Sequence, residues 1–148
     1  MLLVAETPLT MFETTGADEA FLIGRILFGA VLAFMGLNHF MNLDGMAEYA
    51  AYKGLPAPKL SVLASGILLV GAGVGVVTGI APVLAGAGLA AFLLVSAVTM
   101  HDFWAFSGEE QQTEMTQFLK NVALAGGAVA LAALGTAEWA YAVNLGLF

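Results

Sequence analysis

Apolar residues fill four long blocks of this chain, and short polar or glycine- and proline-containing stretches separate the blocks. The blocks cover about residues 20–40, 60–80, 82–101 and 117–137. Each block is close to the length of about 20 residues that crosses a bilayer as an α-helix. The pattern predicts an all-α protein, a four-transmembrane-helix up-down bundle, with one membrane domain over residues 20–137.

Two of the connections between the predicted spans are long. The first, "MNLDGMAEYAAYKGLPAP", predicts a short interfacial helix between helices 1 and 2, which Gly54 and Pro56 end. In the second, "WAFSGEEQQTEMTQ", Ser107 precedes Glu110 by three residues, which is the spacing of a capping box. We therefore expect the fourth helix to begin in water near Gly108 and to continue into the lipid.

An even number of spans places both chain ends on one side of the membrane and both long connections on the other. Residues 1–19 are predicted to form an N-terminal leader, because "MLLVA" lacks the basic residues and the apolar length of a signal peptide. Residues 138–148 are predicted to form a C-terminal tail. The connections and the chain ends therefore carry nearly all of the wetted surface.

Glycines recur along the second, third and fourth spans. Gly71, Gly75 and Gly79 are four residues apart and lie on one face of the second helix. Lipid tails are as apolar as leucine, so the hydrophobic effect does not hold helices together in a membrane. Close packing of helix backbones at rows of small residues does so instead. We expect this row to be a packing seam, either inside the bundle or between two subunits.

Composition places the protein in a membrane. Hydrophobic residues make up 60% of the 148 residues, charged residues make up 10%, and the mean hydropathy is +0.92. So little polar surface cannot coat a soluble domain, and we expect a multi-pass protein of the cell membrane. The net charge of -7 without a basic stripe excludes nucleic acid as a partner. Acidic, lysine-poor wetted segments also predict a halophilic source.

Basic residues favour the cytoplasmic side of a membrane. Lys53, Lys59 and Lys120 lie on the side of the long connections and Arg25 lies on the other. This count places the chain ends outside the cytoplasm. Arg25, near the start of the first span, is expected to extend its side chain to the lipid headgroups.

The chain contains no cysteine. Disulfides, thiolate zinc sites and iron–sulfur clusters carried by this chain are therefore excluded. Any redox role must use a quinone, a haem or a partner subunit to carry the electrons.

Polar residues enter the membrane zone where the predicted spans meet the long connections. They belong to the stretches "LNHF", "MHDFW" and "FLKN", and up-down helices bring these three corners to one level. We predict there a shared binding layer of Asn38, His39, His101, Asp102, Lys120 and Asn121. No catalytic set and no metal-ligand set is predicted. The alternative is that these residues lie at headgroup level beside an aromatic belt.

Several ligands could use such a layer. A quinone head group fits best, because histidine or asparagine can hydrogen-bond its carbonyls, a carboxylate can handle its proton and lipid can take its tail. Two histidines could ligate haem b, but their place at the rim of the bundle argues against it. Zinc would need a ligand beyond two imidazoles and Asp102. His101 and Asp102 could also relay protons without a cofactor.

At these corners the sequence resembles the DoxX family of small four-helix membrane proteins. The resemblance rests on the polar-aromatic corner that ends the first span, then on "GLPAP", "HDFW" and "QFLKNVALAGG" in that order, and it covers about residues 20–134. It implies a four-helix membrane bundle. It also implies redox partners: the DoxD branch forms the membrane part of a thiosulfate:quinone oxidoreductase, and some bacterial relatives associate with sulfur-handling and superoxide-detoxifying enzymes.

The resemblance assigns the family's recurrent polar positions to His101, Asp102, Lys120 and Asn121. Two departures limit this transfer. Leu69 stands where many relatives carry a glutamate, which weakens any carboxylate-dependent chemistry. The stretch "TGIAP" lacks the basic residue that follows the second span in relatives, and that residue would argue for chain ends inside the cytoplasm, against the lysine count.

Three functions of different classes follow. The first is a quinone-interacting subunit of a membrane oxidoreductase. The second is a non-enzymatic membrane partner or assembly subunit that docks on other membrane or peripheral redox proteins, or on another copy of itself. Transport of a small solute ranks last, because no span carries a midplane charge or a broken helix.

Overall fold

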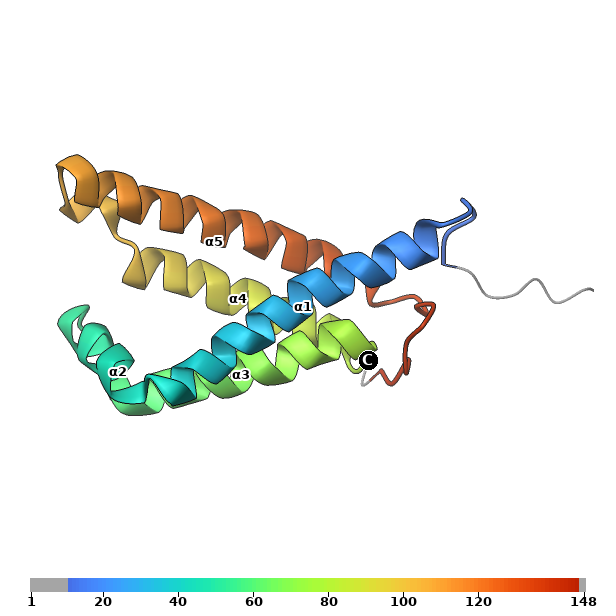
Figure 1. Ribbon diagram of the computed structural model, residues 1–148, viewed down its shortest axis with the longest axis horizontal. Coiled ribbons are helices and arrows are strands. Elements are labelled where there is room, and N and C mark those ends of the chain that lie inside the picture. The colour runs from blue at the N-terminus through green and yellow to red at the C-terminus, as the bar shows by residue number, and fades with distance from the viewer. Residues whose placement is uncertain (1–10, 147–148) are drawn as a thin grey trace, which may run out of the picture.

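The structure, a computed structural model, describes residues 11–146, and the elements within that range are helical. Figure 1 shows them in chain order: α1 (Ala17–Met41), α2 (Leu43–Tyr52), α3 (Pro58–Thr78), α4 (Pro82–Met100), the 3-10 turn η1 (Phe103–Ala105) and α5 (Gly108–Leu134). Four of the helices are long and apolar enough to cross a membrane. The predicted four-helix membrane bundle is confirmed, as is the short helix between its first two spans.

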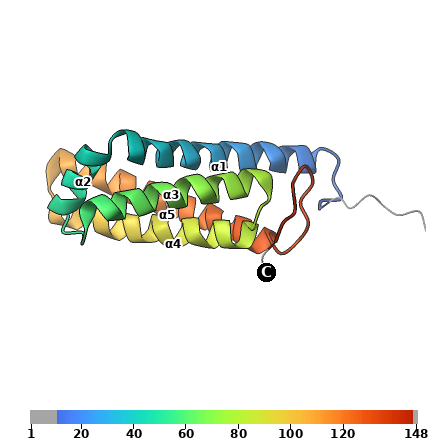
Figure 2. The same cartoon turned by 90° about the horizontal axis from the view of Figure 1, so that it is seen from below.

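The helices form two pairs. α1 packs along α3, α4 packs along α5, and a smaller contact between α3 and α4 joins the pairs. In Figure 1, α3 and α4 leave their common loop and diverge toward the end that carries α2 and η1, which we term the connection end. Figure 2 shows the elongated bundle from below, with the C-terminal segment at the opposite end, which we term the termini end.

Glycine pairs hold α1 against α3. Gly29 faces Gly73, and Gly36 faces Gly66 one pair further along the seam. A Cβ added at Gly73 would lie 2.5 Å from the carbonyl oxygen of Gly29, so the two backbones touch directly. The pairs are seven residues apart on each helix, which keeps them on one face over two turns.

The glycine row predicted from the sequence does not form a seam between two helices of the bundle, and the alternative of a seam between two subunits stays a prediction. A Cβ added at Gly71 would meet nothing within 4 Å, while Gly75 faces the α3–α4 loop and Gly79 faces the C-terminal segment. A spacing of four residues marks one helix face but does not say which neighbour that face meets. Close packing of α4 on α5 instead uses Gly86, where a Cβ would lie 2.7 Å from the carbonyl oxygen of Ala128.

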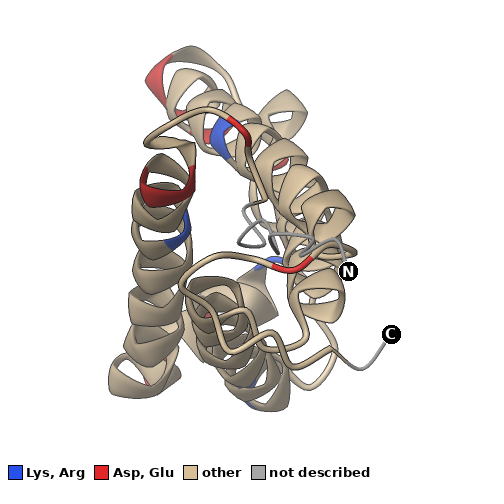
Figure 3. Ribbon diagram, turned by 90° about the vertical axis from the view of Figure 1, so that its right-hand side faces the viewer, with Lys and Arg blue, Asp and Glu red and all other residues tan. Residues whose placement is uncertain are grey.

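Apolar side chains both fill the core and cover the outside. The buried core between the pairs includes Leu32, Leu69, Val76, Leu89 and Leu93. Many other large apolar side chains point outward, and three of them, Leu27, Phe34 and Ile67, are about two-thirds exposed. Seen from the termini end, the ribbon carries few charged residues (Figure 3). Such a surface is stable only against lipid.

The helix starts follow the predicted signals in part. Pro82 lies in the first turn of α4, and α5 begins at Gly108, as predicted. Ser107 is the N-cap of α5, but its side chain makes no capping hydrogen bond, so the predicted capping box is not formed. The extended backbone of Ser107 and the two acids in the first turn of α5 still suit a helix N-terminus.

Residues 139–145 fold back against the termini end. The N–H of Val143 donates a 2.7 Å hydrogen bond to the carbonyl oxygen of Thr78, and a parallel bridge joins the segment to the α3–α4 loop. Trp139 is buried, and its indole N–H donates to the carbonyl oxygen of Leu134. Most of the segment predicted as a C-terminal tail thus packs on the bundle.

Arg25 is the buried cation of the termini end. Its side chain is fully buried, and its two terminal nitrogens donate to the carbonyl oxygens of Ala140 at 3.1 Å and Tyr141 at 2.9 Å. The guanidinium also lies over the rings of Phe21 and Trp139, about 5 Å from each centroid. The expectation that Arg25 extends to the headgroups is wrong, because the C-terminal segment covers it and α1 begins more than two turns earlier.

Candidate functional site

Five polar residues meet at the connection end. Two come from α2 and its C-cap, two follow the last turn of α4, and one lies in the second turn of α5. We term Tyr49, Lys53, His101, Asp102 and Glu114 the connection-end cluster. The turn η1 brings α5 back beside the end of α4, which places residues distant in sequence at one level.

Lys53 bridges α2 to the corner between α4 and α5. Its ammonium nitrogen lies 2.5 Å from Oδ1 of Asp102, and its side chain is only 4% exposed, against 30% for Asp102. The same nitrogen lies 4.7 Å from the ring centroid of Phe106 and 5.5 Å from that of Tyr49. A cation so far removed from water is stabilised by both the carboxylate and the aromatic faces.

His101 joins the end of α4 to α5. Its Nδ1 lies 2.8 Å from Oε2 of Glu114, and the two side chains are half-buried. A carboxylate at this position favours the tautomer with the proton on Nδ1, which leaves a lone pair on Nε2. When the ring gains a second proton, Nε2 becomes a donor and Glu114 becomes its ion-pair partner. His101 can therefore exchange a proton through Nε2 while Glu114 orients the ring.

The charged groups of the cluster shift the pKa values of Lys53 and Tyr49. Burial acts to lower the pKa of Lys53, but the hydrogen bond to Asp102, aided by Tyr49, outweighs burial and raises that pKa above its usual value. Burial raises the pKa of Tyr49, and the carboxylate of Glu114 adds to the rise while Lys53 opposes it. At neutral pH, Lys53 is thus charged and Tyr49 is neutral.

The raised pKa of Lys53 predicts an alkaline limit to the link between α2 and the α4–α5 corner. A group with a raised folded-state pKa stabilises the fold below its unfolded pKa, here near 10.5, and this contribution disappears as pH rises through the folded-state pKa. We expect the stability difference between wild type and Lys53→Met to be constant from about pH 7 to about pH 10 and to shrink above that.

Thermal unfolding in detergent at stepped pH measures this difference. Lys59→Met is the matched control, because Lys59 pairs with Asp44 at an exposed site. An exposed pair contributes little to stability, so we expect this control to match the wild type at every pH. A Lys53 contribution that already disappears between about pH 7 and about pH 9 would contradict the prediction.

The structure gathers part of the predicted polar layer. His101 and Asp102 belong to the connection-end cluster. Asn121 is 6% exposed and lies deeper, with its side-chain nitrogen 3.4 Å from Oγ of Ser96. The α4–α5 pair therefore carries polar groups at two depths: the cluster residues at its end and the buried amide of Asn121 further inside.

The other predicted residues bond locally. His39 places Nδ1 2.8 Å from a carbonyl oxygen of its own helix, Asn38 accepts from the side chain of Asn42, and Lys120 donates to a glutamine one turn earlier. The extensive contacts of α1 are with α3, and the polar residues at its end bond along their own helix. The binding role assigned to all six residues stays a prediction.

Three cluster members carry no functional role in the sequence-based prediction. Lys53 enters it only as a marker of orientation, while Tyr49 and Glu114 have no part in the predicted layer. For each of the three residues, the sequence contains a spacing that could have placed it in the cluster. Tyr49 and Lys53 are four residues apart and share a helix face. Since α5 begins at Gly108, Glu114 lies almost two turns into the helix and faces the end of the antiparallel α4.

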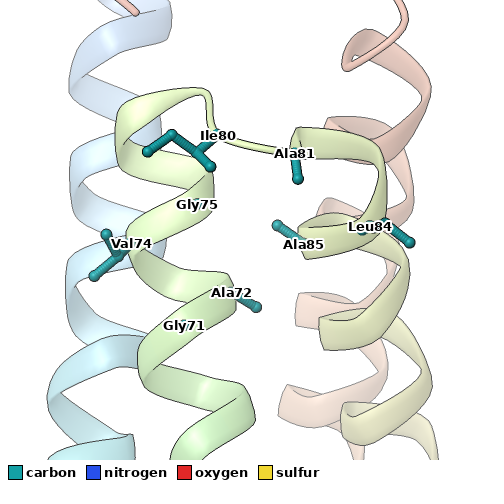
Figure 4. Close-up of a pocket in the computed structure, with 8 residues that line it drawn as sticks. All are labelled: Gly71, Ala72, Val74, Gly75, Ile80, Ala81, Leu84 and Ala85. Carbon is teal, nitrogen blue, oxygen red and sulfur yellow. The ribbon is translucent and has the colours of Figure 1, made fainter. Parts of the chain in front are cut away.

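An apolar groove of about 300 Å³ lies between α3 and α4 near the termini end (Figure 4). Its lining consists of Gly71, Ala72, Val74, Gly75, Ile80, Ala81, Leu84 and Ala85. No lining side chain is polar, so the groove offers contact to a hydrocarbon chain but no group that recognises a polar head. It flanks the loop at the opposite end of α3 from α2, and so is separate from the connection-end cluster.

Fold and cluster together define a small multi-pass integral membrane protein, a four-helix bundle in which a short helix carries polar side chains to the corner between α4 and α5. The chain belongs to the DoxX family, whose profile matches residues 20–102. It is 30% identical over 114 residues to Inner membrane protein YphA of Escherichia coli (strain K12), and the alignment covers 77% of this chain and 81% of YphA. No solved structure matches the chain. Four of the five cluster residues lie in the region that the family profile matches, and Glu114 lies beyond it.

Proposed function

We propose that this DoxX-family protein binds a quinone head group at the connection-end cluster and acts as the quinone-interacting subunit of a membrane oxidoreductase. The observation that carries the proposal is the half-buried His101–Glu114 pair at the end of a membrane-spanning helix. Quinones dissolve in lipid, yet their redox chemistry takes up and releases protons. They therefore need a proton-exchanging side chain at the boundary between lipid and water.

The His101–Glu114 pair has both states that quinone chemistry uses. With its proton on Nδ1, His101 can accept a hydrogen bond at Nε2 from a quinol hydroxyl, and once protonated it can donate one to a quinone carbonyl. The carboxylate of Glu114, 2.8 Å from Nδ1, orients the ring. Phe103, Trp104 and Phe118 pack edge to face on the same corner and supply apolar surface for a ring.

The electrons would come from a partner protein. The chain has no cysteine, and residues 11–146 contain no group of three His, Cys, Asp or Glu side chains arranged to hold a metal ion. Reduction of a quinone to a quinol takes two electrons and two protons, and the groups in this chain supply only the proton exchange. The proposal therefore includes a redox partner, which fits the role of a subunit.

Protein purified gently from its native membrane is expected to carry a quinone that organic solvent extracts. His101→Ala is expected to lower the quinone-to-protein ratio about tenfold, because one lost hydrogen bond to a polar head group corresponds to roughly 1.4 kcal/mol. His39→Ala is the matched control, since it removes the other histidine, whose ring bonds within α1. Chromatography of the extracts measures the ratio.

Two outcomes would count against this function. Wild-type protein without extractable quinone would contradict the proposal, because the proposed ligand would not be bound. Equal losses in His101→Ala and His39→Ala would show that quinone binding does not depend on the connection-end cluster in particular.

A second candidate is a non-enzymatic partner or assembly subunit. The internal pairing of the cluster favours it, because Lys53 with Asp102 and His101 with Glu114 satisfy one another without a ligand. Co-purification from native membranes at fixed stoichiometry would support this role, and a protein that migrates alone would argue against it.

A further inference from the structure

The two halves of the bundle are firmly joined at the termini end. One half consists of α1, α2 and α3, and the other of α4, η1 and α5. The α3–α4 loop links them covalently, and the segment that follows α5 bonds back to the first half. Arg25 donates to the carbonyl oxygens of Ala140 and Tyr141, and the N–H of Val143 donates to that of Thr78. Backbone atoms take part in all of these contacts.

At the connection end the halves are joined by side chains of α2. Lys53 reaches Asp102 and lies over Phe106, and the hydroxyl of Tyr49 makes a long, 3.4 Å contact with the carbonyl oxygen of Met100. The extensive helix contacts of α2 are with α3 and, less closely, with α1. Beyond the apolar core between the halves, the links at this end are therefore side-chain contacts, whereas those at the termini end involve backbone atoms.

The packing of α3 against α4 also becomes less tight from their common loop toward the connection end. Near the loop, a Cβ added at Gly75 would lie 2.8 Å from the carbonyl oxygen of Ile80 and 3.0 Å from Cβ of Ala85. Further along α4, a Cβ at Gly88 would meet only a side-chain atom of Leu68, at 3.2 Å. Figure 1 shows the corresponding divergence of the two helices toward the connection end.

We propose that the bundle opens at its connection end about a hinge at its termini end, and that the Lys53–Asp102 pair is the latch that keeps it closed. The two halves move as units, because the glycine contacts within α1–α3 and within α4–α5 lie inside each half.

The motion itself needs no ligand and so is independent of the proposed function. If quinone binding holds, the opening gives the head group a route from the cluster to the interior.

Spin labels can test the motion, since a chain without cysteine accepts labels only at introduced positions. Glu48→Cys with Gln111→Cys places exposed labels on α2 and α5 across the connection end. Leu27→Cys with Val129→Cys places exposed labels on α1 and α5 toward the termini end. Pulsed double electron–electron resonance in lipid nanodiscs gives the distance distribution for each label pair, without added ligand.

Lys53→Met is expected to raise the ratio of long to short distances across the connection end about tenfold and to leave the termini-end distribution unchanged. Asp102→Asn is expected to act in the same direction. Lys59→Met breaks an ion pair whose side chains are 63% and 86% exposed, and it is expected to change neither distribution.

Distributions that Lys53→Met leaves unchanged at both ends would overturn the latch. Broadening at both ends would overturn the hinge, because it would show a general loosening of the bundle. A protein that carries no quinone but shows the expected distances would remove the proposed function and leave this inference in place.

Discussion

Gly73→Ala is expected to lower the free energy of unfolding by about 1–3 kcal/mol, the range typical of overpacking a tight interior. The added Cβ would lie 2.5 Å from the carbonyl oxygen of Gly29 and 2.8 Å from the backbone nitrogen of Ala33. Neither backbone atom can rotate away, so α1 and α3 must separate. The loss of contact along the seam exceeds the gain from alanine's helix propensity, which is at most about 1 kcal/mol.

Gly71→Ala is the matched control for the seam. It makes the same chemical change two residues earlier on the same helix, where the added Cβ meets nothing within 4 Å. We expect its stability to equal or slightly exceed that of the wild type. Unfolding by denaturing detergent, followed by circular dichroism, compares the two variants. Equal destabilisation of both would show that these glycines act through helix flexibility and not through contact with α1.

Arg25→Met is expected to release residues 139–145 from the termini end. Hydrogen bonds from a charged donor contribute roughly 1.5–3 kcal/mol each, and the change leaves the carbonyl oxygens of Ala140 and Tyr141 without their donor. Amide hydrogen exchange at Val143 is expected to rise on the order of 100-fold through local opening. Exchange along α3 is expected to stay unchanged, because its seam with α1 is intact.

Two further variants separate the contributions at Arg25. Tyr141→Phe removes only the exposed contact of the Tyr141 hydroxyl with Glu19, and we expect exchange at Val143 to change little. Arg25→Lys keeps a charge but lacks the planar fork that meets two carbonyls, so we expect an intermediate rise. Exchange that Arg25→Met leaves unchanged would show that the bond to Thr78 and the burial of Trp139 hold the segment without the guanidinium.

The sequence predicts the elements of this fold well because their signals are local. Apolar length defines four spans, and turn residues define the helix between the first two. The polar start of α5 at Gly108 also follows from the residues around it. His101 and Asp102 are correctly placed at the end of α4, since the apolar run stops there.

The pairing of helices could not be predicted in the same way. In a membrane protein both the lipid-facing and the buried faces are apolar, so hydropathy does not mark the face that packs. The seam at Gly29 and Gly73, the burial of Arg25 and the partnership of His101 with Glu114 all depend on contacts between distant segments. Hence the predicted polar layer includes His39, although α1 turns its glycine face to α3 and keeps that histidine in local bonds.

Arg25 and Ala140 are separated by 115 positions in the chain. During synthesis, α1 therefore enters the membrane long before the carbonyl oxygens that receive its guanidinium exist. A cation without partners is costly in hydrocarbon, so the partners that stabilise Arg25 in the fold become available only after residues 139–145 have been made. A nascent chain that stops short of this segment lacks both carbonyl acceptors of the buried cation in its first helix.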